Sequence, residues 1–454
     1  MHIASATPVH PSAAMRESPD TAILRVGFVP ALNRSAGGVY QYSATLMDAL
    51  ADIARQDRTL ELVALVPEGV SEMHAELEAR GWRVVPAAAP VGAVRGALRR
   101  IAGEGPHRDA WRWLRGRLEG RAALAPRGPG GATHRTREDL GAWWKAQGIE
   151  LVIFPQPHPW SFEAGVPSIV AIHDLQHRLQ PEFPEVSADG EWERREDLLR
   201  NCVAHTAAIL VDSEVGRQHV RLFYGAYGAS NERVHVLPFL PASTMPRTVS
   251  ESASAAVRRR HGIPDAYIFY PAQFWSHKNH ARIIESLEQI RNSEGLEIHA
   301  VFCGSHSGAE RERHFAQLVS MAEQCGVSQQ IHVLGFVSDD DLAALYAGAR
   351  ALVMPTFFGP TNIPVLEAWA LNCPVLTSDI PGVREQAGDA ALLVDPRRVD
   401  ELAAGILQLW KDEELRRTLT RRGTERLASY GPAEFKNLLR AALQSARSAM
   451  HERR

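Results

Sequence analysis

The sequence predicts an α/β protein of two domains, each built around a doubly wound parallel sheet. The chain has 454 residues, which is too long for a single hydrophobic core and suits two domains of ordinary size. Short runs rich in Val, Ile and Leu, bounded by turn residues, alternate with longer helical patterns. Such continuous apolar runs are typical of parallel strands that helices cover on both faces.

Each half of the chain contributes its own set of expected strands, separated by helical patterns. In the first half they lie at 23–30, 60–67, 151–155, 168–174, 207–213 and 233–239. In the second half they lie at 267–273, 298–304, 330–336, 349–355, 373–379 and 390–396. We therefore expect one parallel sheet in each domain, with ligands bound outside the carboxyl ends of the strands.

Composition also suggests where the domains end. Residues 1–22 lack the apolar core of a signal peptide and are expected to form a flexible leader. The first domain is expected at 23–245 and the second at 258–431. Between them, 241–257 is rich in Ser, Thr and Pro and has no apolar period. The final segment, 432–454, has an amphipathic helix pattern and is expected to return to the first domain, since a cleft needs a hinge.

The bulk composition narrows the class of protein. With 45% hydrophobic and 23% charged residues, the chain resembles an ordinary globular enzyme, and a net charge of −3 gives no general argument for nucleic-acid binding. Its cysteines have no CxxC spacing, which favours buried thiols in a reducing compartment over disulfides or a zinc site. No apolar run reaches the roughly 18 residues of a membrane-spanning helix. We expect a cytoplasmic protein, with peripheral contact at the inner face of the membrane left open.

The stretch Arg95–Arg121, inside an expected insertion at about 90–140, breaks the α/β pattern. It holds eight arginines against three acidic residues, with Trp111 and Trp113 among them. One interpretation is a solvated insertion between two strands of the first domain. The other is a basic surface helix that contacts anionic lipid headgroups or a diphosphate-linked acceptor. The stretch that follows it, 125–139, is low in apolar residues and is expected to be a loop.

Two strand-to-helix junctions could hold an anion. Gly37 and Gly38 follow the first strand and precede a helix expected to start near Val39, where backbone N–H groups and the helix N-terminus favour negative charge. The same pattern occurs in the simple turns of many proteins. At the start of the second domain, Lys278 stands between a strand and a helix, where it is either a surface lysine or a point charge for phosphate in the ligand crevice.

The sequence FGPTNIPVLEAW, at 358–369, contains a third such junction. Thr361 or Asn362 is a plausible N-cap for a helix that begins near Ile363, with free N–H groups facing the crevice. Glu367 follows one turn inside an otherwise apolar segment. A lone carboxylate there is either exposed or needs strong donors, and the ribose hydroxyls of a nucleotide are donors of that kind.

Other polar clusters are less specific. His173 and Asp174 end a strand, so they either have a structural role or point into the ligand crevice. The acidic run 338–341 is best explained as the cap and first turn of a helix. The sequence has no GxGxxG, no GxxxxGK[ST], no HExxH and no GxSxG, so dinucleotide and P-loop functions have no support.

These stretches together resemble family 4 glycosyltransferases, which are retaining enzymes of the GT-B fold. The resemblance rests on GGVYQY, HDLQH, FWSHKNH and GPTNIPVLEAWALNCPVLTSDIPGVREQAGDAALLVDP, and it is most specific over 267–396. The GPTN sequence is similar to that of one sub-branch of the family. What the resemblance implies is two Rossmann-like domains facing a central cleft, with transfer of a sugar from a nucleotide-diphosphate donor and no metal or other cofactor.

The resemblance also implies roles for individual residues. The expected catalytic residues are His173, which reaches the donor sugar, Lys278, which contacts the diphosphate, and Glu367, which takes the ribose hydroxyls. The turn before the last of these offers backbone amides to phosphate. The expected donor-binding residues are Gly37, Gly38, Gln273, Lys278, Gly359, Pro360, Thr361, Asn362, Ile363 and Glu367, and no metal site is expected.

Two positions depart from the family pattern. Many members have a glutamate eight residues before the ribose-binding one, where this chain has Gly359. Many also have an arginine five residues before the lysine, where this chain has Gln273. These departures leave open which groups hold the sugar hydroxyls and how much cationic charge meets the diphosphate.

The leading hypothesis is a retaining hexosyltransferase acting on a glycan or lipid-linked acceptor in surface polysaccharide synthesis. Mannose is the first expectation for the sugar, followed by rhamnose or glucose. A sugar-nucleotide epimerase or hydrolase on the same fold would bind the donor without an acceptor. A non-catalytic nucleotide-sugar-binding subunit is a third possibility, suggested by Gly359, but it would not need His173, Lys278 and Glu367 together.

Overall fold

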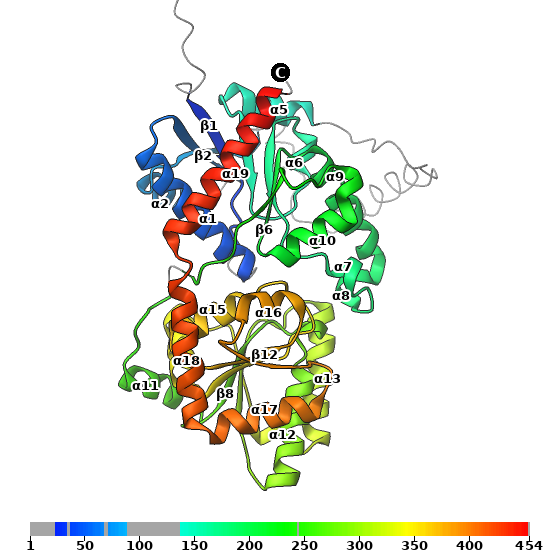
Figure 1. Cartoon of the computed structure of the whole chain (residues 1–454), viewed down its shortest axis with the longest axis vertical. Helices are drawn as coiled ribbons and strands as arrows, with labels where there is room; N and C mark the ends of the chain where they lie inside the picture. Colours follow the sequence, from blue (N-terminus) through cyan, green and yellow to red (C-terminus); the bar gives the residue numbers. More distant parts are fainter. Residues whose placement is uncertain (1–22, 34–36, 68–70, 89–136, 243–244, 453–454) are drawn as a thin grey trace, which may run out of the picture.

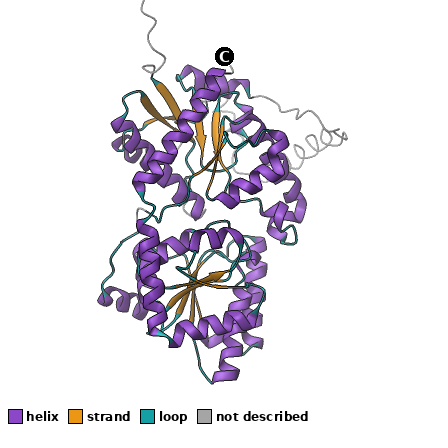
Figure 2. Ribbon diagram, in the orientation of Figure 1, coloured by secondary structure: helices purple, strands orange, loops and turns teal. Residues whose placement is uncertain are grey.

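The computed structural model describes residues 23–33, 37–67, 71–88, 137–242 and 245–452 (Figure 1). They form two α/β domains, stacked along the long axis of the molecule, and each has a sheet with helices on both faces (Figure 2). The basic stretch Arg95–Arg121 and the leader 1–22 lie outside the described residues. Among the helices described, none combines the length and apolar character that crossing a membrane requires.

The N-terminal domain contains a parallel sheet of seven strands in the order β3-β2-β1-β4-β5-β6-β7. Its strands are β1 (Leu24–Phe28), β2 (Leu60–Val66), β3 (Arg83–Pro86), β4 (Leu151–Phe154), β5 (Ser168–Ala171), β6 (Ala208–Val211) and β7 (Val234–Val236). Strand β3 was not predicted. It is a short edge strand that begins with an exposed arginine, so it lacks the apolar run by which the buried strands were found.

The helices of the N-terminal domain cover both faces of this sheet (Figure 2). They are α1 (Gly38–Gln56), α2 (Ser71–Ala79), α5 (Glu138–Ala146), α6 (Trp160–Glu163), α7 (Gln176–Leu179), α8 (Pro184–Ser187), α9 (Glu191–His205) and α10 (Glu214–Tyr224). Helix α5 corrects one expectation, because the end of the predicted loop 125–139 is already helical at Glu138 and Asp139. Acidic side chains are favourable in a first helical turn.

The C-terminal domain contains a parallel sheet of six strands in the order β10-β9-β8-β11-β12-β13. Its strands are β8 (Ile268–Pro271), β9 (Ala300–Cys303), β10 (Ile331–Gly335), β11 (Ala351–Met354), β12 (Val375–Ser378) and β13 (Leu392–Val394). Its helices are α11 (Glu251–His261), α12 (His280–Glu294), α13 (Ala309–Gln324), α14 (Asp339–Gly348), α15 (Ile363–Ala370), α16 (Pro381–Ala387), α17 (Val399–Lys411) and α18 (Glu413–Ala428). The acidic run 338–341 is a helix start, where the Ser338 hydroxyl accepts a hydrogen bond from the Asp341 amide.

Helix α11 occupies the second part of the segment expected to link the domains. The Ser250 hydroxyl caps it by accepting a hydrogen bond of 3.2 Å from the Ala253 amide. The buried Ser254 hydroxyl donates to the Ala344 carbonyl of α14 at 3.0 Å. The C-terminal domain therefore begins before residue 258, because serines that looked like linker residues serve as a cap and a packing contact.

The last helix, α19 (Pro432–Glu452), packs on the N-terminal domain, and Figure 1 shows it running up that domain in red. Phe435, Leu439 and Ala442 are buried in the same core as β1 and α1. Lys436 pairs with Asp52 of α1 at 3.0 Å. The chain therefore crosses between the domains twice, once before α11 and once before α19.

Candidate active site in the cleft between the domains

A pocket of about 310 Å³ lies between the two domains. Residues that follow β5 and β6 line one side of it, and residues that follow β8 and β11 line the other, so the carboxyl ends of both sheets meet there. The residues that line it include His173, Asp174, Gln176, Glu185, Arg195, Asp212, Trp275, His277, Lys278, Gly359, Pro360, Thr361 and Asn362. The structure therefore brings His173, Lys278 and the GPTN turn to one place.

His173 follows β5 and faces this pocket. Its Nε2 lies 2.7 Å from the Pro155 carbonyl, and its ring packs edge-on against Tyr42 with centroids 4.8 Å apart. Burial lowers the pKa of His173, so the ring is neutral. Because a carbonyl only accepts, Nε2 carries the proton and Nδ1 is an acceptor. A neutral imidazole of this tautomer can accept a hydrogen bond from a sugar hydroxyl.

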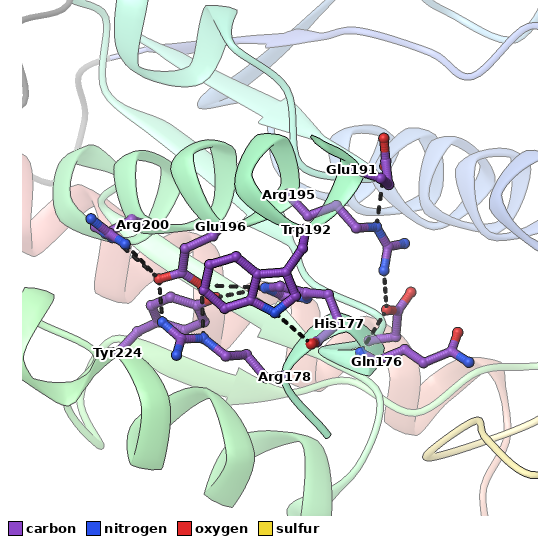
Figure 3. A network of polar contacts seen from close by, with 10 residues as sticks. Gln176, His177, Arg178, Glu191, Trp192, Arg195, Glu196, Arg200 and Tyr224 are labelled. Carbon is purple, nitrogen blue, oxygen red and sulfur yellow. Dashed lines mark hydrogen bonds and ion pairs between the residues drawn. The ribbon is translucent and has the colours of Figure 1, made fainter. Parts of the chain in front are cut away.

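The HDLQH turn that carries His173 is held by a polar network on α9 (Figure 3). The buried Glu196 carboxylate accepts hydrogen bonds from Arg178, Arg200 and Tyr224. The Trp192 indole donates to the His177 carbonyl at 2.7 Å. These contacts hold the turn rigidly against α9, so the side chains before it reach the cleft in a fixed orientation.

Lys278 ends a short 3₁₀ turn, Ser276–Lys278, that follows β8. The next residue, Asn279, has a positive φ of 63°, and its buried amide donates to the Pro355 and Pro396 carbonyls at 2.8 Å each. Burial lowers the pKa of Lys278 to about 8, although Asp174 and Glu185 act in the opposite direction. The ammonium is therefore partly desolvated but still mostly charged at neutral pH, which suits a contact with phosphate.

The GPTN turn links β11 to α15 and contacts the opposite domain. The Thr361 hydroxyl donates to Asp212 at 2.6 Å. Asn362 is the N-cap residue of α15, but its side chain makes no capping bond. Its amide N–H donates to the Gln386 side chain at 2.9 Å. The expectation of free N–H groups at both Thr361 and Asn362 is therefore wrong for Asn362, whose amide is taken by a residue of α16 in this conformation.

Gly359 has a backbone conformation that favours glycine. Its φ is 134°, and a Cβ at this position would lie 2.8 Å from Oδ1 of Asn362. The turn is also packed closely from outside, because a Cβ on Gly382 would lie 2.2 Å from the Pro360 carbonyl oxygen. A glutamate at position 359 would strain this turn, because its backbone conformation is one that side chains rarely adopt.

Glu367 is buried beside the pocket and does not line it. Its side chain accepts hydrogen bonds from the Tyr346 hydroxyl at 2.9 Å and from the Gln41 amide of the other domain at 3.0 Å. Burial raises its pKa to about 7. A ribose hydroxyl can contact this carboxylate only if it shares the carboxylate with the Gln41 side-chain amide or displaces that amide. The ribose role remains a prediction.

The glycine loop of the N-terminal domain lies close to the same helix start. A Cβ on Gly38 would lie 3.5 Å from Ile363 Cδ1, and one on Gly37 would lie 3.8 Å from Gln273 Nε2. Gln273 in turn accepts a hydrogen bond of 2.8 Å from Arg311 of α13. Position 273 lacks the arginine that many family members have, but the guanidinium of Arg311, from α13, lies beside it.

Further contacts hold the two domains together around the pocket. Glu385 of α16 accepts hydrogen bonds from the Glu214 and Val215 amides, at 2.7 and 2.9 Å, and so caps α10 of the other domain. Gln180 donates to the Phe357 carbonyl at 2.9 Å. The two domains are therefore closed around the pocket in this structure.

Sequence reasoning missed Asp212 and Glu185 as lining residues. Asp212 follows β6 directly, so the argument that selected His173 and Asp174 after β5 would also have selected it. Burial raises the pKa of Asp212 to about 7, with hydrogen bonds from Thr361 and Ser213 acting against that rise. Glu185 lies in a polar segment with no motif, and no local pattern marks it.

The two facing Rossmann-like domains and the cleft between them define the GT-B class of fold. The structure of the Anabaena protein Alr3699/HepE in complex with UDP and glucose has the same fold, with a TM-score of 0.63 and 15% identity over 93% of this chain and 100% of that one. Residues 254–426 match the family described as "Glycosyl transferases group 1". This match covers the C-terminal domain, and together with the GT-B fold it supports a family 4-type glycosyltransferase.

The matches to curated relatives cover smaller shares of those proteins than the structural match above does. The chain is 43% identical to O-antigen chain mannosyltransferase B of Escherichia coli over 93 residues, which are 20% of this chain and 24% of that protein. It is 25% identical to alpha-D-kanosaminyltransferase of Streptomyces kanamyceticus over 291 residues, or 62% of this chain and 71% of that protein.

Proposed function

We propose that the chain is a retaining, metal-independent glycosyltransferase that moves a hexose from a nucleotide-diphosphate sugar to a glycan or lipid-linked acceptor in surface polysaccharide synthesis. The observation that carries this proposal is the convergence of His173, Lys278 and the GPTN turn on one pocket between the domains. Similarity to an O-antigen mannosyltransferase favours mannose as the sugar.

Stabilisation of the leaving diphosphate is the main task of the site. As the glycosidic bond breaks, negative charge grows on the diphosphate while the sugar becomes oxocarbenium-like. Lys278 supplies a fixed positive charge on one side of the pocket. Groups that are already oriented toward a developing charge lower the barrier, because they need no rearrangement during the reaction.

The helix starts near the pocket support transfer without a metal ion. Helices α1 and α15 both begin beside it, and neither has an acidic residue in its first turn. Their N-termini therefore keep their positive potential for an anionic ligand. Together with Lys278, they can provide the charge stabilisation that a divalent cation provides in other enzymes.

Retention follows from attack on the face of the sugar that the leaving group occupies. In this proposal the donor phosphate takes the proton of the acceptor hydroxyl. His173 accepts a hydrogen bond from a sugar hydroxyl and orients the ring. Glu367 contacts the ribose once Gln41 gives up or shares the carboxylate.

The test is incubation of the protein with radiolabelled GDP-mannose, UDP-glucose or dTDP-rhamnose in EDTA, with and without bacterial lipid extract. Label that moves into lipid or glycan, with the anomeric configuration of the donor by NMR, supports the proposal. Release of free sugar or of an epimer contradicts it, as does donor binding without turnover. Loss of transfer in EDTA contradicts the metal-independent part. Lys278→Ala is the comparison variant, in which transfer should be strongly reduced.

A further inference from the structure

Glu185 of α8 lines the pocket and has a buried carboxylate oxygen with no hydrogen-bond partner among the described residues. Its side chain is 5% exposed, and it lines the pocket together with Lys278 and Gly359. Its Oε1 accepts hydrogen bonds from the His277 backbone amide at 3.0 Å and from the His277 ring at 2.6 Å. Its Oε2 is buried and has no hydrogen-bond partner among the described residues.

A buried acceptor without a donor is costly, so it usually marks a place where a ligand or water completes the hydrogen bonding. The two bonds from His277 fix the orientation of the carboxylate, which leaves Oε2 in one position. Burial alone would raise the pKa of Glu185, but the hydrogen bonds from His277 outweigh it and the pKa lies below its ordinary value. At neutral pH this oxygen can therefore only accept a hydrogen bond.

The other carboxylates of the pocket already have donors. Asp174 accepts hydrogen bonds on Oδ1 from the Gln176 amide and from Arg195, at 3.1 and 3.2 Å, and its side chain is 36% exposed, so water can reach it. Asp212 accepts one bond on each oxygen, from Ser213 at 3.2 Å and from Thr361 at 2.6 Å. Among the carboxylates that line the pocket, Glu185 is thus the one with a buried oxygen that lacks a partner.

The side of the pocket formed by the C-terminal domain offers no carboxylate among its lining residues. The resemblance to family 4 enzymes places a glutamate there, and the positive φ of Gly359 disfavours any side chain. The carboxylates that line the pocket, Asp174, Glu185 and Asp212, all come from the N-terminal domain. Sugar hydroxyls are the donors that a fixed carboxylate oxygen in a sugar site would accept from.

We propose that Glu185 accepts a hydrogen bond from a hydroxyl of the donor sugar through Oε2 and is a specificity-determining residue of the transfer reaction. This proposal rests on the function proposed above. Since Glu185 and its partner His277 come from different domains, the sugar site is complete only when the cleft is closed.

The test compares Glu185→Gln with Glu182→Gln, an exposed glutamate of the same segment. Calorimetry with GDP-mannose and GDP, and with UDP-glucose and UDP, separates sugar contacts from nucleotide contacts. Glu185→Gln should lose 10- to 100-fold in affinity for the sugar nucleotide that binds and less than twofold for the matching diphosphate, whereas Glu182→Gln changes neither. Equal losses for both ligands, or no loss, would overturn the proposal.

A second measurement begins with the wild-type protein alone, and its first step needs no variant. A series of GDP-deoxymannoses, each lacking one hydroxyl, should include one that loses 10- to 100-fold in affinity relative to GDP-mannose. That same analogue should bind Glu185→Gln and wild type equally. A series in which no hydroxyl matters contradicts the proposal. Because all of these readouts are binding, they remain informative if the proposed transfer is not observed.

Discussion

The side chain of Gln41, on the first helix, donates a hydrogen bond of 3.0 Å to Glu367, which lies 326 positions later on α15 of the other domain. Tyr346 donates to the second oxygen of the same carboxylate. Glu367 is thus held by one residue from its own domain and one from across the cleft. Opening the domains removes one of its two donors, so the state of this carboxylate depends on the position of the domains.

Glu367→Ala is expected to weaken binding of the nucleotide-diphosphate sugar by about 1.5–3 kcal/mol, the usual worth of a hydrogen bond to a charged group. Calorimetry with GDP-mannose and UDP-glucose measures the change. Gln41→Ala is the matched control, because it removes the amide and leaves the acceptor for the ribose in place. The affinity of Gln41→Ala for the nucleotide-diphosphate sugar should stay within about threefold of that of wild type. An unchanged nucleotide affinity in folded Glu367→Ala would remove the ribose role.

Lys278→Ala is expected to lower kcat by about 100-fold or more and to change the donor KM less, because the negative charge on the leaving group grows in the transition state. Steady-state kinetics over a range of donor concentrations separates the two effects. Lys436→Ala, which removes a lysine of α19 that pairs with Asp52, is the control for loss of a positive charge elsewhere. A raised KM with unchanged kcat would show that Lys278 only binds the donor.

Asp212→Asn is expected to reduce the pH dependence of stability. The pKa of Asp212 rises from 3.8 to about 7 in the folded chain, so the folded chain keeps a proton that the unfolded chain loses. Stability from this group is therefore present below about pH 4 and falls as the pH rises toward 7. Since one pKa unit is worth about 1.4 kcal/mol, the decline in the free energy of unfolding should be roughly 2–4 kcal/mol smaller in the variant.

Urea unfolding of the ligand-free protein at pH 4.5 and pH 7.5 measures this difference. Asparagine can still accept the hydrogen bond from Thr361, so the contact between the domains is kept. Wild type should retain the larger decline, and some decline should remain in the variant, because the pKa of Glu367 is raised in the same direction. Parallel pH profiles for the two proteins would show that Asp212 stays ionised in the folded state.

Gly359→Glu is expected to lower activity, although it restores the residue that many family members have at this position. A side chain there meets Asn362 and a φ of 134°, which costs about 1–3 kcal/mol and displaces the turn. Gly359→Ala, with the same Cβ and no carboxylate, should show a similar loss in transfer rate and in melting temperature. A Glu variant that clearly exceeds the Ala variant in activity would mean that the turn adapts and the carboxylate works.

Local pattern was enough to predict most of the sheet strands and the starts of the key helices. Buried strands such as β4 and β11 are apolar at every position, and Ser338 caps α14 as its sequence suggests. Strand β3 was missed because an edge strand with an exposed arginine has no such run. Helix α11 was missed because serine is common both in linkers and at helix caps, and only its packing on α14 distinguishes the two.

By itself, the sequence determined which residues stand at the carboxyl ends of the strands: His173, Lys278 and the GPTN turn. Apolar periodicity and turn residues are local features, so they can be recognised in the sequence without knowledge of the fold. Only the tertiary structure decided that Gln41 meets Glu367 and that Glu185 meets His277. These contacts join residues of different domains, so they depend on strand order and domain closure. No short stretch of sequence encodes strand order or domain closure. The unpaired oxygen of Glu185 could therefore be found only in the folded chain.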